Sequence, residues 1–135
     1  MIDTYRGAVY HNQLDHMGHM NVQYYTSMFD QATWHLFNEV GLTPTYFKEN
    51  DRAMAAAEQT FKYKKELFPG DVVHIKSKVL EVKNRAFLFL HTMYDSETGD
   101  EVASTNTVAV HLDTTIRNPC PLPDAIKVAM KKLIE

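Results

Sequence analysis

Residues 15–40 read DHMGHMNVQYYTSMFDQATWHLFNEV, and Gly41 follows directly. The first seven residues of this stretch are a polar segment with one aspartate, two histidines, a glycine and an asparagine. Apolar side chains recur every three or four positions in the rest: Tyr25, Phe29, Ala32, Leu36 and Val40. That spacing is the period of one face of an α-helix. Because Met28, Trp34 and Phe37 widen the apolar stripe, we expect a long and largely buried helix over residues 22–40.

The two ends of this helix are also indicated by the sequence. Asn21 suits the N-cap position, where its side chain can accept a hydrogen bond from a free backbone N–H of the first turn. Gly41 suits the position after the helix, where a left-handed backbone is needed. The free N–H groups and the helix dipole favour negative charge at the helix start. We therefore expect Asp15 and the helix start to form a candidate site.

The composition limits what the whole chain can be. A chain of 135 residues is typical of one domain, so residues 1–135 are interpreted as a single domain. A net charge of −3 gives no general attraction to nucleic acid. No apolar run reaches the ~20 residues of a membrane span, and the N-terminus lacks the pattern of a signal peptide. The single cysteine, Cys120, fits a reducing compartment, so we expect a cytoplasmic protein without membrane or nucleic-acid partners.

The rest of the chain is mostly strand-like. Alternating apolar and polar residues, or β-branched and aromatic runs, predict five strands over residues 4–12, 60–67, 72–82, 87–94 and 102–112. Residues 53–59 are rich in Ala and Met and fit either a helix or a strand. Pro44 is expected to stop helical continuation, which makes residues 42–52 a connection. Asp124 is expected to cap a short C-terminal helix.

Successive strands with short turns favour an antiparallel meander. The 22–40 helix is the only large apolar helix available to cover one face of that sheet. We therefore expect an α+β fold in which an antiparallel sheet of about five strands curls around a central helix. Pairing an open sheet edge with a second copy would remove an aggregation hazard, so a symmetric dimer is expected.

The polar segment also carries a motif. Asp15-x-x-Gly18-His19-x-Asn21-x-x-x-Tyr25, between a first strand and a long helix, resembles the signature of the 4-hydroxybenzoyl-CoA thioesterase branch of the hotdog-fold superfamily. The resemblance implies a sheet wrapped around a helix, assembled as a homodimer or homotetramer. It also implies hydrolysis of acyl-CoA thioesters without a metal or other cofactor, with coenzyme A entering only as part of the substrate.

The resemblance assigns roles by position. It makes Asp15 the catalytic carboxylate and the backbone N–H of Val22 the donor that polarises the thioester carbonyl. Lys83 and Arg85 fall near basic residues that bind coenzyme A phosphates in relatives. His19, Asn21 and Tyr25 complete the predicted substrate-binding set: His19 either bonds within the site or locks the turn, and Tyr25 also fits core packing.

Two features of the sequence leave the identity of the acyl group open. Gln13 stands where many relatives carry a second acidic residue, and the DHMGHMN turn is similar to that of thioesterases acting on betainyl-CoA. Trp34 and His35 fit either core positions or an acyl pocket. Lys62, Lys64 and Lys65 are interpreted as a solvated strand face rather than a phosphate site.

Thioester hydrolysis needs a nucleophile or base and a stabiliser for the developing oxyanion. Aspartate can attack the carbonyl carbon to give a mixed anhydride, or take a proton from an attacking water. The sequence leaves both routes open for Asp15. It also leaves two other functions open, a non-catalytic acyl-CoA sensor and a hotdog-fold hydratase acting on enoyl thioesters. His16 and His19 are spaced like metal ligands but lack an evident third ligand, so no metal site is predicted.

Overall fold

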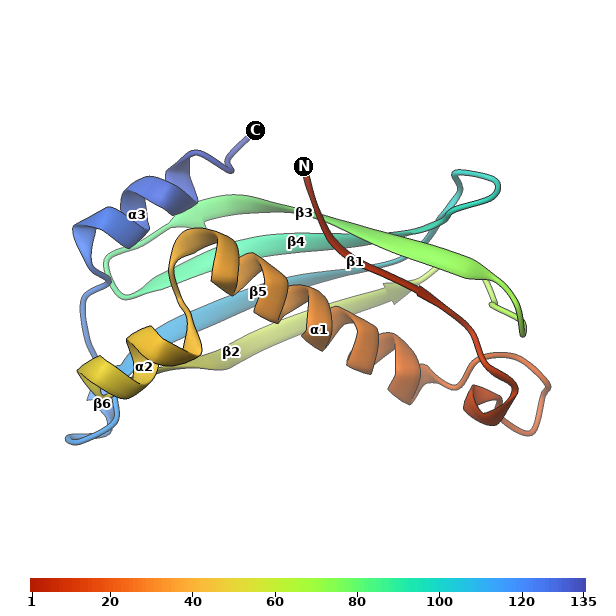
Figure 1. Cartoon of the computed structure of the whole chain (residues 1–135), viewed down its shortest axis with the longest axis horizontal. Helices are drawn as coiled ribbons and strands as arrows, with labels where there is room; N and C mark the ends of the chain where they lie inside the picture. The colour runs from red at the N-terminus through yellow and green to blue at the C-terminus, as the bar shows by residue number, and fades with distance from the viewer.

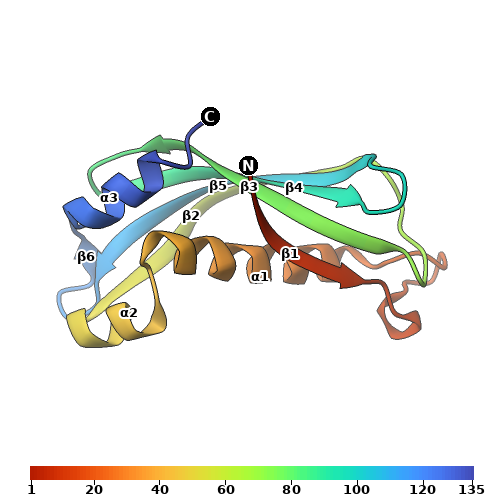
Figure 2. The same ribbon diagram turned by 45° about the horizontal axis from the view of Figure 1, so that its top comes forward.

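A curved antiparallel sheet wraps around one long helix in the computed structural model, which describes all 135 residues. The helix α1 (Val22–Val40) lies against one face of the sheet (Figure 1), and the sheet arches over it in Figure 2. The strand order is β1-β3-β4-β5-β2, and a short β6 pairs with β5. The strands are β1 (Ile2–Ala8), β2 (Arg52–Tyr63), β3 (Val72–Val82), β4 (Ala86–Asp95), β5 (Glu101–Asp113) and β6 (Asn118–Pro119).

Three short helices complete the chain. They are the 3₁₀ helix η1 (His11–Gln13), α2 (Pro44–Asn50) and α3 (Asp124–Lys131). The helix η1 lies in the connection from β1 to α1, and α3 lies at the opposite end of the molecule (Figure 1). This is the expected α+β hotdog architecture, with a long central helix and a short C-terminal helix.

Both predicted ends of α1 are confirmed. The Asn21 side chain accepts a hydrogen bond from the backbone N–H of Gln23. Gly41 has φ +94°, the left-handed conformation that ends a helix without steric cost to a Cβ. The predicted apolar stripe is buried with one exception: the Trp34 side chain is half exposed, because it lies over the sheet edge rather than the sheet centre.

The inner face of the sheet forms the other half of the core. Alternate residues of β3 are fully buried, as the sequence predicted: Val73, Ile75, Ser77 and Val79. The buried apolar side chains form two clusters along α1, one around Met28 and Phe29 and the other around Leu36 and Phe37. The apolar face of α1 is buried from Tyr25 to Val40, which anchors the helix against the sheet, and the candidate site lies at its N-terminus.

Buried polar side chains cross this core as a hydrogen-bonded chain. The hydroxyls of Thr4 and Ser77 are 2.7 Å apart, and Ser77 also contacts Nδ1 of His91. Nε2 of His91 lies 2.9 Å from the hydroxyl of Thr33 on α1, which in turn donates to the Phe29 carbonyl. Each of these four side chains therefore has a hydrogen-bond partner, which avoids the desolvation cost of an unpaired buried polar group.

Several expected boundaries were wrong. β1 ends at Ala8 and η1 follows, because residues 9–12 pair with no strand of the sheet. Pro44 begins α2 instead of ending helical structure, since proline is favoured at the first position of a helix. The ambiguous residues 53–59 belong to β2, which runs from Arg52 to Tyr63 and pairs with β5 on both sides of an irregularity between Ala56 and Glu58.

The predicted antiparallel meander was only partly correct. β3, β4 and β5 are consecutive neighbours, but β2 pairs with β5 and not with β3. The segment after β2 instead crosses to the other edge of the sheet, where β3 pairs with β1. As a result β2 is an edge strand, and its residues 55–60 are all exposed.

None of the helices combines the length and the apolar character that crossing a membrane requires.

Candidate functional site

The polar turn before α1 is a closed loop. Leu14 and Met20 form an isolated antiparallel bridge, and the Asp15 N–H donates to the His19 carbonyl at 2.9 Å. Gly18 has φ +85°, a left-handed conformation that favours glycine within the loop. The Met20 N–H donates to the Leu67 carbonyl at 2.8 Å, which ties the loop to the segment after β2. The backbone that carries the Asp15 side chain is therefore held by hydrogen bonds within the loop and to the segment after β2.

Local contacts fix the orientation of that carboxylate. Its Oδ1 accepts a hydrogen bond from the Met17 N–H at 2.8 Å. Its Oδ2 lies 3.5 Å from Nδ1 of His19, and Nε2 of the same ring lies 3.6 Å from a carboxylate oxygen of Glu66. Both distances to His19 are longer than a good hydrogen bond. The side chain of Asp15 is 20% exposed, so Oδ2 remains accessible to a substrate or a water.

The first turn of α1 leaves one backbone donor free. The Gln23 N–H donates to the Asn21 side chain, and the Tyr24 N–H donates to the Asn21 carbonyl. The Val22 N–H makes no hydrogen bond within the chain. The capping role of Asn21 therefore leaves Val22 as the available donor at the positive end of the helix dipole.

Asp15 and Val22 line the same hollow of about 310 Å³. His19 and Tyr25, also predicted from the motif, line it with them. The other lining residues come from the turn and from the end of β2 and the segment after it: Met20, Tyr63, Lys64, Lys65 and Glu66. The structure therefore places a carboxylate, an imidazole and an uncommitted backbone N–H around one space.

Tyr25 contacts two of the other residues that line the Asp15 hollow. Its hydroxyl donates to the Lys65 carbonyl at 3.1 Å, and its ring packs edge-on against Tyr63. Burial and, next, the nearby Glu66 carboxylate raise the pKa of Tyr25 to about 12. The hydroxyl therefore stays protonated and committed to Lys65, which supports a structural role for Tyr25.

Two predicted binding residues lie elsewhere in the structure. Lys83 and Arg85 are exposed in the turn between β3 and β4, beside α3 and at the end of the molecule opposite to the Asp15 turn (Figure 1). This turn is tied to the C-terminal part by a 2.7 Å hydrogen bond from Lys127 to Asn84. The structure of the chain therefore does not bring Lys83 and Arg85 to Asp15.

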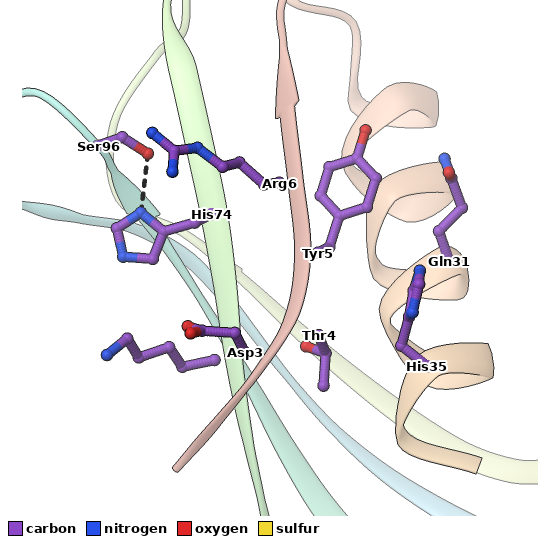
Figure 3. A pocket seen from close by; sticks show the side chains of 9 residues that line it. Asp3, Thr4, Tyr5, Arg6, Gln31, His35, His74 and Ser96 are labelled. Carbon is purple, nitrogen blue, oxygen red and sulfur yellow. Dashed lines mark hydrogen bonds between the residues drawn. The ribbon is translucent and has the colours of Figure 1, made fainter. Parts of the chain in front are cut away.

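Two further hollows flank α1. The larger, about 790 Å³, is polar and follows β1: Arg6, His74 and Lys76 line it from the sheet, and Gln31 and His35 line it from α1 (Figure 3). It shares no residue with the Asp15 hollow. The other, about 260 Å³, is mostly apolar and lies between α1, α2 and β2, with Trp34 in its wall. Trp34 and His35 are both exposed, so neither is a core position, and they line two different hollows.

Sequence reasoning missed Tyr63 and Glu66 as neighbours of the motif. They lie more than 40 residues from Asp15 in the sequence. The pairing of β2 with β5 and the hydrogen bond from the Met20 N–H to the Leu67 carbonyl bring them close to it. Lys64 and Lys65, interpreted as a solvated face, are exposed but also line the hollow, where they pair with Glu101 and Asp100. No local pattern in the sequence signals these contacts.

The family profile of the thioesterase-like superfamily matches residues 9–130. The chain belongs to this superfamily. The match includes the Asp15 turn, α1 and the sheet from β2 to β5. The resemblance to hotdog-fold thioesterases is thereby confirmed, and membership supports the prediction of a thioester hydrolase.

Among curated proteins, the chain is 21% identical over 135 residues to the L-carnitine dehydrogenase/betainyl-CoA thioesterase of Rhizobium meliloti. The match covers the whole chain but only 26% of the relative, so the chain spans about a quarter of that protein's length.

Solved structures share the superfamily fold. A Staphylococcus aureus protein solved in complex with CoA superposes with a TM-score of 0.91 at 15% identity, covering 99% of this chain and 87% of the other. A 1,4-dihydroxy-2-naphthoyl-CoA thioesterase from Synechocystis superposes with a TM-score of 0.84 at 18% identity, covering 96% and 95% of the two chains.

Proposed function

We propose that this protein is an acyl-CoA thioesterase that hydrolyses its substrate in the Asp15 hollow. The observation that carries the proposal is the pairing of an oriented, accessible carboxylate with the free N–H of Val22 in one space. Membership of the thioesterase-like superfamily supports the reaction type, and the CoA complex of a structural relative supports coenzyme A as the carrier.

The reaction begins at the thioester carbonyl. Its oxygen accepts a hydrogen bond from the Val22 N–H, and negative charge develops there as the carbonyl carbon is attacked. Oδ2 of Asp15 either attacks that carbon directly or removes a proton from an attacking water. The C–S bond then breaks, coenzyme A leaves as a thiolate, and the products are the free acid and coenzyme A. A backbone donor of this kind contributes about 3–4 kcal/mol to the transition state.

His19 acts as a positioning residue in this scheme. Its ring lies between the Asp15 and Glu66 carboxylates and packs edge-on against Phe68, so it has neighbours on three sides. A thiolate leaves more readily than an amide nitrogen, so the reaction needs no strong general acid. His19 therefore serves the reaction by holding Oδ2 of Asp15 toward the hollow.

The working unit is a homodimer formed through β2. This strand is a sheet edge 12 residues long, and its central residues are exposed small or polar side chains. An edge of this length carries unpaired N–H and C=O groups that a second copy can satisfy. Antiparallel pairing of two β2 strands extends the sheet across both subunits and places α1 of each subunit on the same face. Lys83 and Arg85 remain the proposed contacts for coenzyme A phosphates, and the dimer brings the partner's end of the sheet toward Asp15.

One observation favours a second function. Hotdog-fold hydratases use an aspartate with a histidine, and the Asp15 carboxylate does lie beside His19. A hydratase adds water across the double bond of an enoyl thioester and leaves the C–S bond intact. A sensor would bind the thioester and leave both the double bond and the C–S bond intact.

The test is a panel of thioesters assayed by two readouts. Acetyl-, long-chain, 4-hydroxybenzoyl-, betainyl- and enoyl-CoA are each incubated with the protein, and free thiol and enoyl absorbance are followed together. A thioesterase releases thiol from at least one saturated or aromatic substrate. Loss of enoyl absorbance without thiol would establish a hydratase instead. Tight binding without either change would establish a sensor.

A further inference from the structure

The apolar hollow between α1, α2 and β2 has no role in the reaction described so far. Four of its lining residues are aromatic: Trp34 and Phe37 from α1, Phe47 from α2 and Phe89 from β4. The ring of Trp34 stands nearly perpendicular to two of the phenylalanines, at 75° to Phe37 and 78° to Phe47, with centroids 5.8 and 6.3 Å away. Aromatic rings at right angles offer several π faces to one guest, which is the arrangement that binds quaternary ammonium groups.

The charges around this hollow also favour a cation. Asp30, one turn before Trp34 on α1, lines the hollow and takes part in no ion pair. Arg52 lines it too, but its guanidinium is paired with the Asp113 carboxylate at 3.1 Å. The uncompensated charge at the aromatic wall is therefore negative. Trp34 is 49% exposed, so its ring is accessible to a ligand.

An unpaired hydroxyl lies at the base of the hollow. Thr107 on β5 is only 4% exposed and lines the hollow, and its Oγ1 has no hydrogen-bond partner in the chain. A buried hydroxyl without a partner carries a desolvation cost of about 1–3 kcal/mol. Its lone pairs are available to the polarised methyl hydrogens of a quaternary ammonium guest, which are positively charged.

Within one subunit this hollow is too far from the reacting carbonyl. Trp34 follows Val22 by 12 residues of helix, which corresponds to about 18 Å at 1.5 Å per residue. In an acyl group that carries its ammonium on the carbon next to the carbonyl, the two ends are less than about 3 Å apart. The hollow and the Asp15 site of the same subunit therefore cannot serve such a group together.

The β2 dimer joins the hollow of one subunit to the Asp15 site of the other. Pairing two β2 strands antiparallel about their midpoint places Tyr63 opposite the partner's Arg52. Tyr63 lines the Asp15 hollow, and Arg52 lines the aromatic hollow. Paired strands lie about 4.8 Å apart, so the two hollows become neighbours across the interface. Both open on the α1 side of the sheet, since each has residues of α1 and β2 in its walls.

We propose that the aromatic hollow of one subunit binds the cationic end of a quaternary-ammonium acyl thioester whose carbonyl is hydrolysed at Asp15 of the other subunit. Trp34, Phe37 and Phe47 face the methyl groups, and Asp30 supplies the compensating charge. The substrate class is therefore a short thioester ending in trimethylammonium. This inference rests on the proposed thioesterase function and adds the specificity of its acyl site.

The test compares two acyl groups that differ only in charge. Betainyl-CoA ends in a trimethylammonium group, and 3,3-dimethylbutanoyl-CoA carries a tert-butyl group of the same shape at the same place. The measured quantity is the ratio of their kcat/KM values in each variant, because comparing variants cancels the intrinsic reactivity of the two thioesters. Trp34→Leu and Asp30→Asn should each lower the betainyl preference by about tenfold. Glu39→Gln, which removes an exposed carboxylate of α1 outside the hollow, should leave the ratio unchanged.

A binding readout keeps the test independent of turnover. Trp34 is the only tryptophan of the chain, so fluorescence excited beyond the tyrosine absorption band reports this hollow. In Asp15→Asn, betainyl-CoA should change the fluorescence at a concentration about tenfold lower than 3,3-dimethylbutanoyl-CoA does. Melting temperatures of all variants verify folding.

The outcomes separate the two proposals. Thiol release with a betainyl ratio that neither Trp34→Leu nor Asp30→Asn alters would overturn the cation site and leave the thioesterase intact. A preference for 4-hydroxybenzoyl-CoA over betainyl-CoA would also overturn it, in favour of an aryl pocket. Absence of thiol release from every thioester would reject the thioesterase itself.

Discussion

Oδ2 of Asp15 lies 3.5 Å from Nδ1 of His19, while Oδ1 of the same carboxylate is held by the Met17 N–H. One oxygen is thus fixed by the backbone of the turn, and the other is left facing an imidazole and the hollow. The contact with Met17 is an Asx-turn bond, which orients the carboxylate and leaves Oδ2 without a backbone donor.

Replacing His19 by Gln should lower kcat by about tenfold, because the carboxylate loses one orienting neighbour but keeps its bond to Met17. KM and the melting temperature should change little. His16→Gln is the matched control, since His16 lies in the same turn but is exposed. A loss of kcat as large as that caused by removing the Asp15 carboxylate would transfer the chemistry to His19.

The Val22 donor can be deleted without losing the helix. Val22 is the first residue of α1, the position at which proline is best tolerated, and Asn21 before it already has the extended backbone that a following proline requires. Val22→Pro removes only an N–H that makes no bond in the chain. We expect kcat to fall by about 10²–10³-fold with the fold retained.

Val22→Ala is the control for this change, because it shortens the side chain but keeps the N–H. Its kcat should stay within about threefold of the wild type. Equal activity of the proline and alanine variants would show that the oxyanion is stabilised elsewhere.

The predictability of this site from sequence is uneven for a physical reason. Asn21, Gly41 and the spacing of apolar residues between them are local signals, so α1 and both of its ends could be predicted. Residues 53–59 could not, because an Ala- and Met-rich segment has no decisive period and becomes a strand through its pairing with β5. The same pairing brings Tyr63 and Glu66 to the Asp15 turn, so the far wall of the site depends on long-range contacts.

Acid should destabilise the protein through His91. Burial lowers the pKa of His91 to about 3 from 6.5. As the pH falls below 6.5 the unfolded chain takes up a proton that the folded chain does not, so the free energy of unfolding decreases from pH 6.5 down to about pH 3. The largest slope from this single group is about 1.4 kcal/mol per pH unit.

Urea unfolding of wild type and His91→Gln between pH 7 and pH 4.5 measures this contribution. The variant should be less stable at pH 7, because the contacts with Ser77 and Thr33 are disturbed, but its stability should decline less steeply with acid. Parallel declines in the two proteins would show that carboxylates or other groups cause the acid sensitivity.

Dimerisation through β2 can be tested by adding a negative charge to the exposed edge of this strand. Ala57 lies at the middle of the exposed edge, next to Glu58, so Ala57→Glu would gather four carboxylates beside the two-fold axis of the pair. We expect light scattering to show a monomer, with loss of thiol release because each site needs the other subunit. Val128→Glu, an equal charge on the exposed face of α3, should leave a homodimer with full activity. An active monomer of Ala57→Glu would contradict the shared site.

The central claim is that the Asp15 carboxylate carries out thioester hydrolysis, and thiol release by Asp15→Asn against the preferred acyl-CoA tests it most directly. Asparagine keeps the shape of the side chain and can still accept the Met17 N–H, so folding and dimerisation should match the wild type. We predict that kcat/KM falls by about a hundredfold or more. A folded, dimeric Asp15→Asn protein that releases thiol at the wild-type rate would contradict the account.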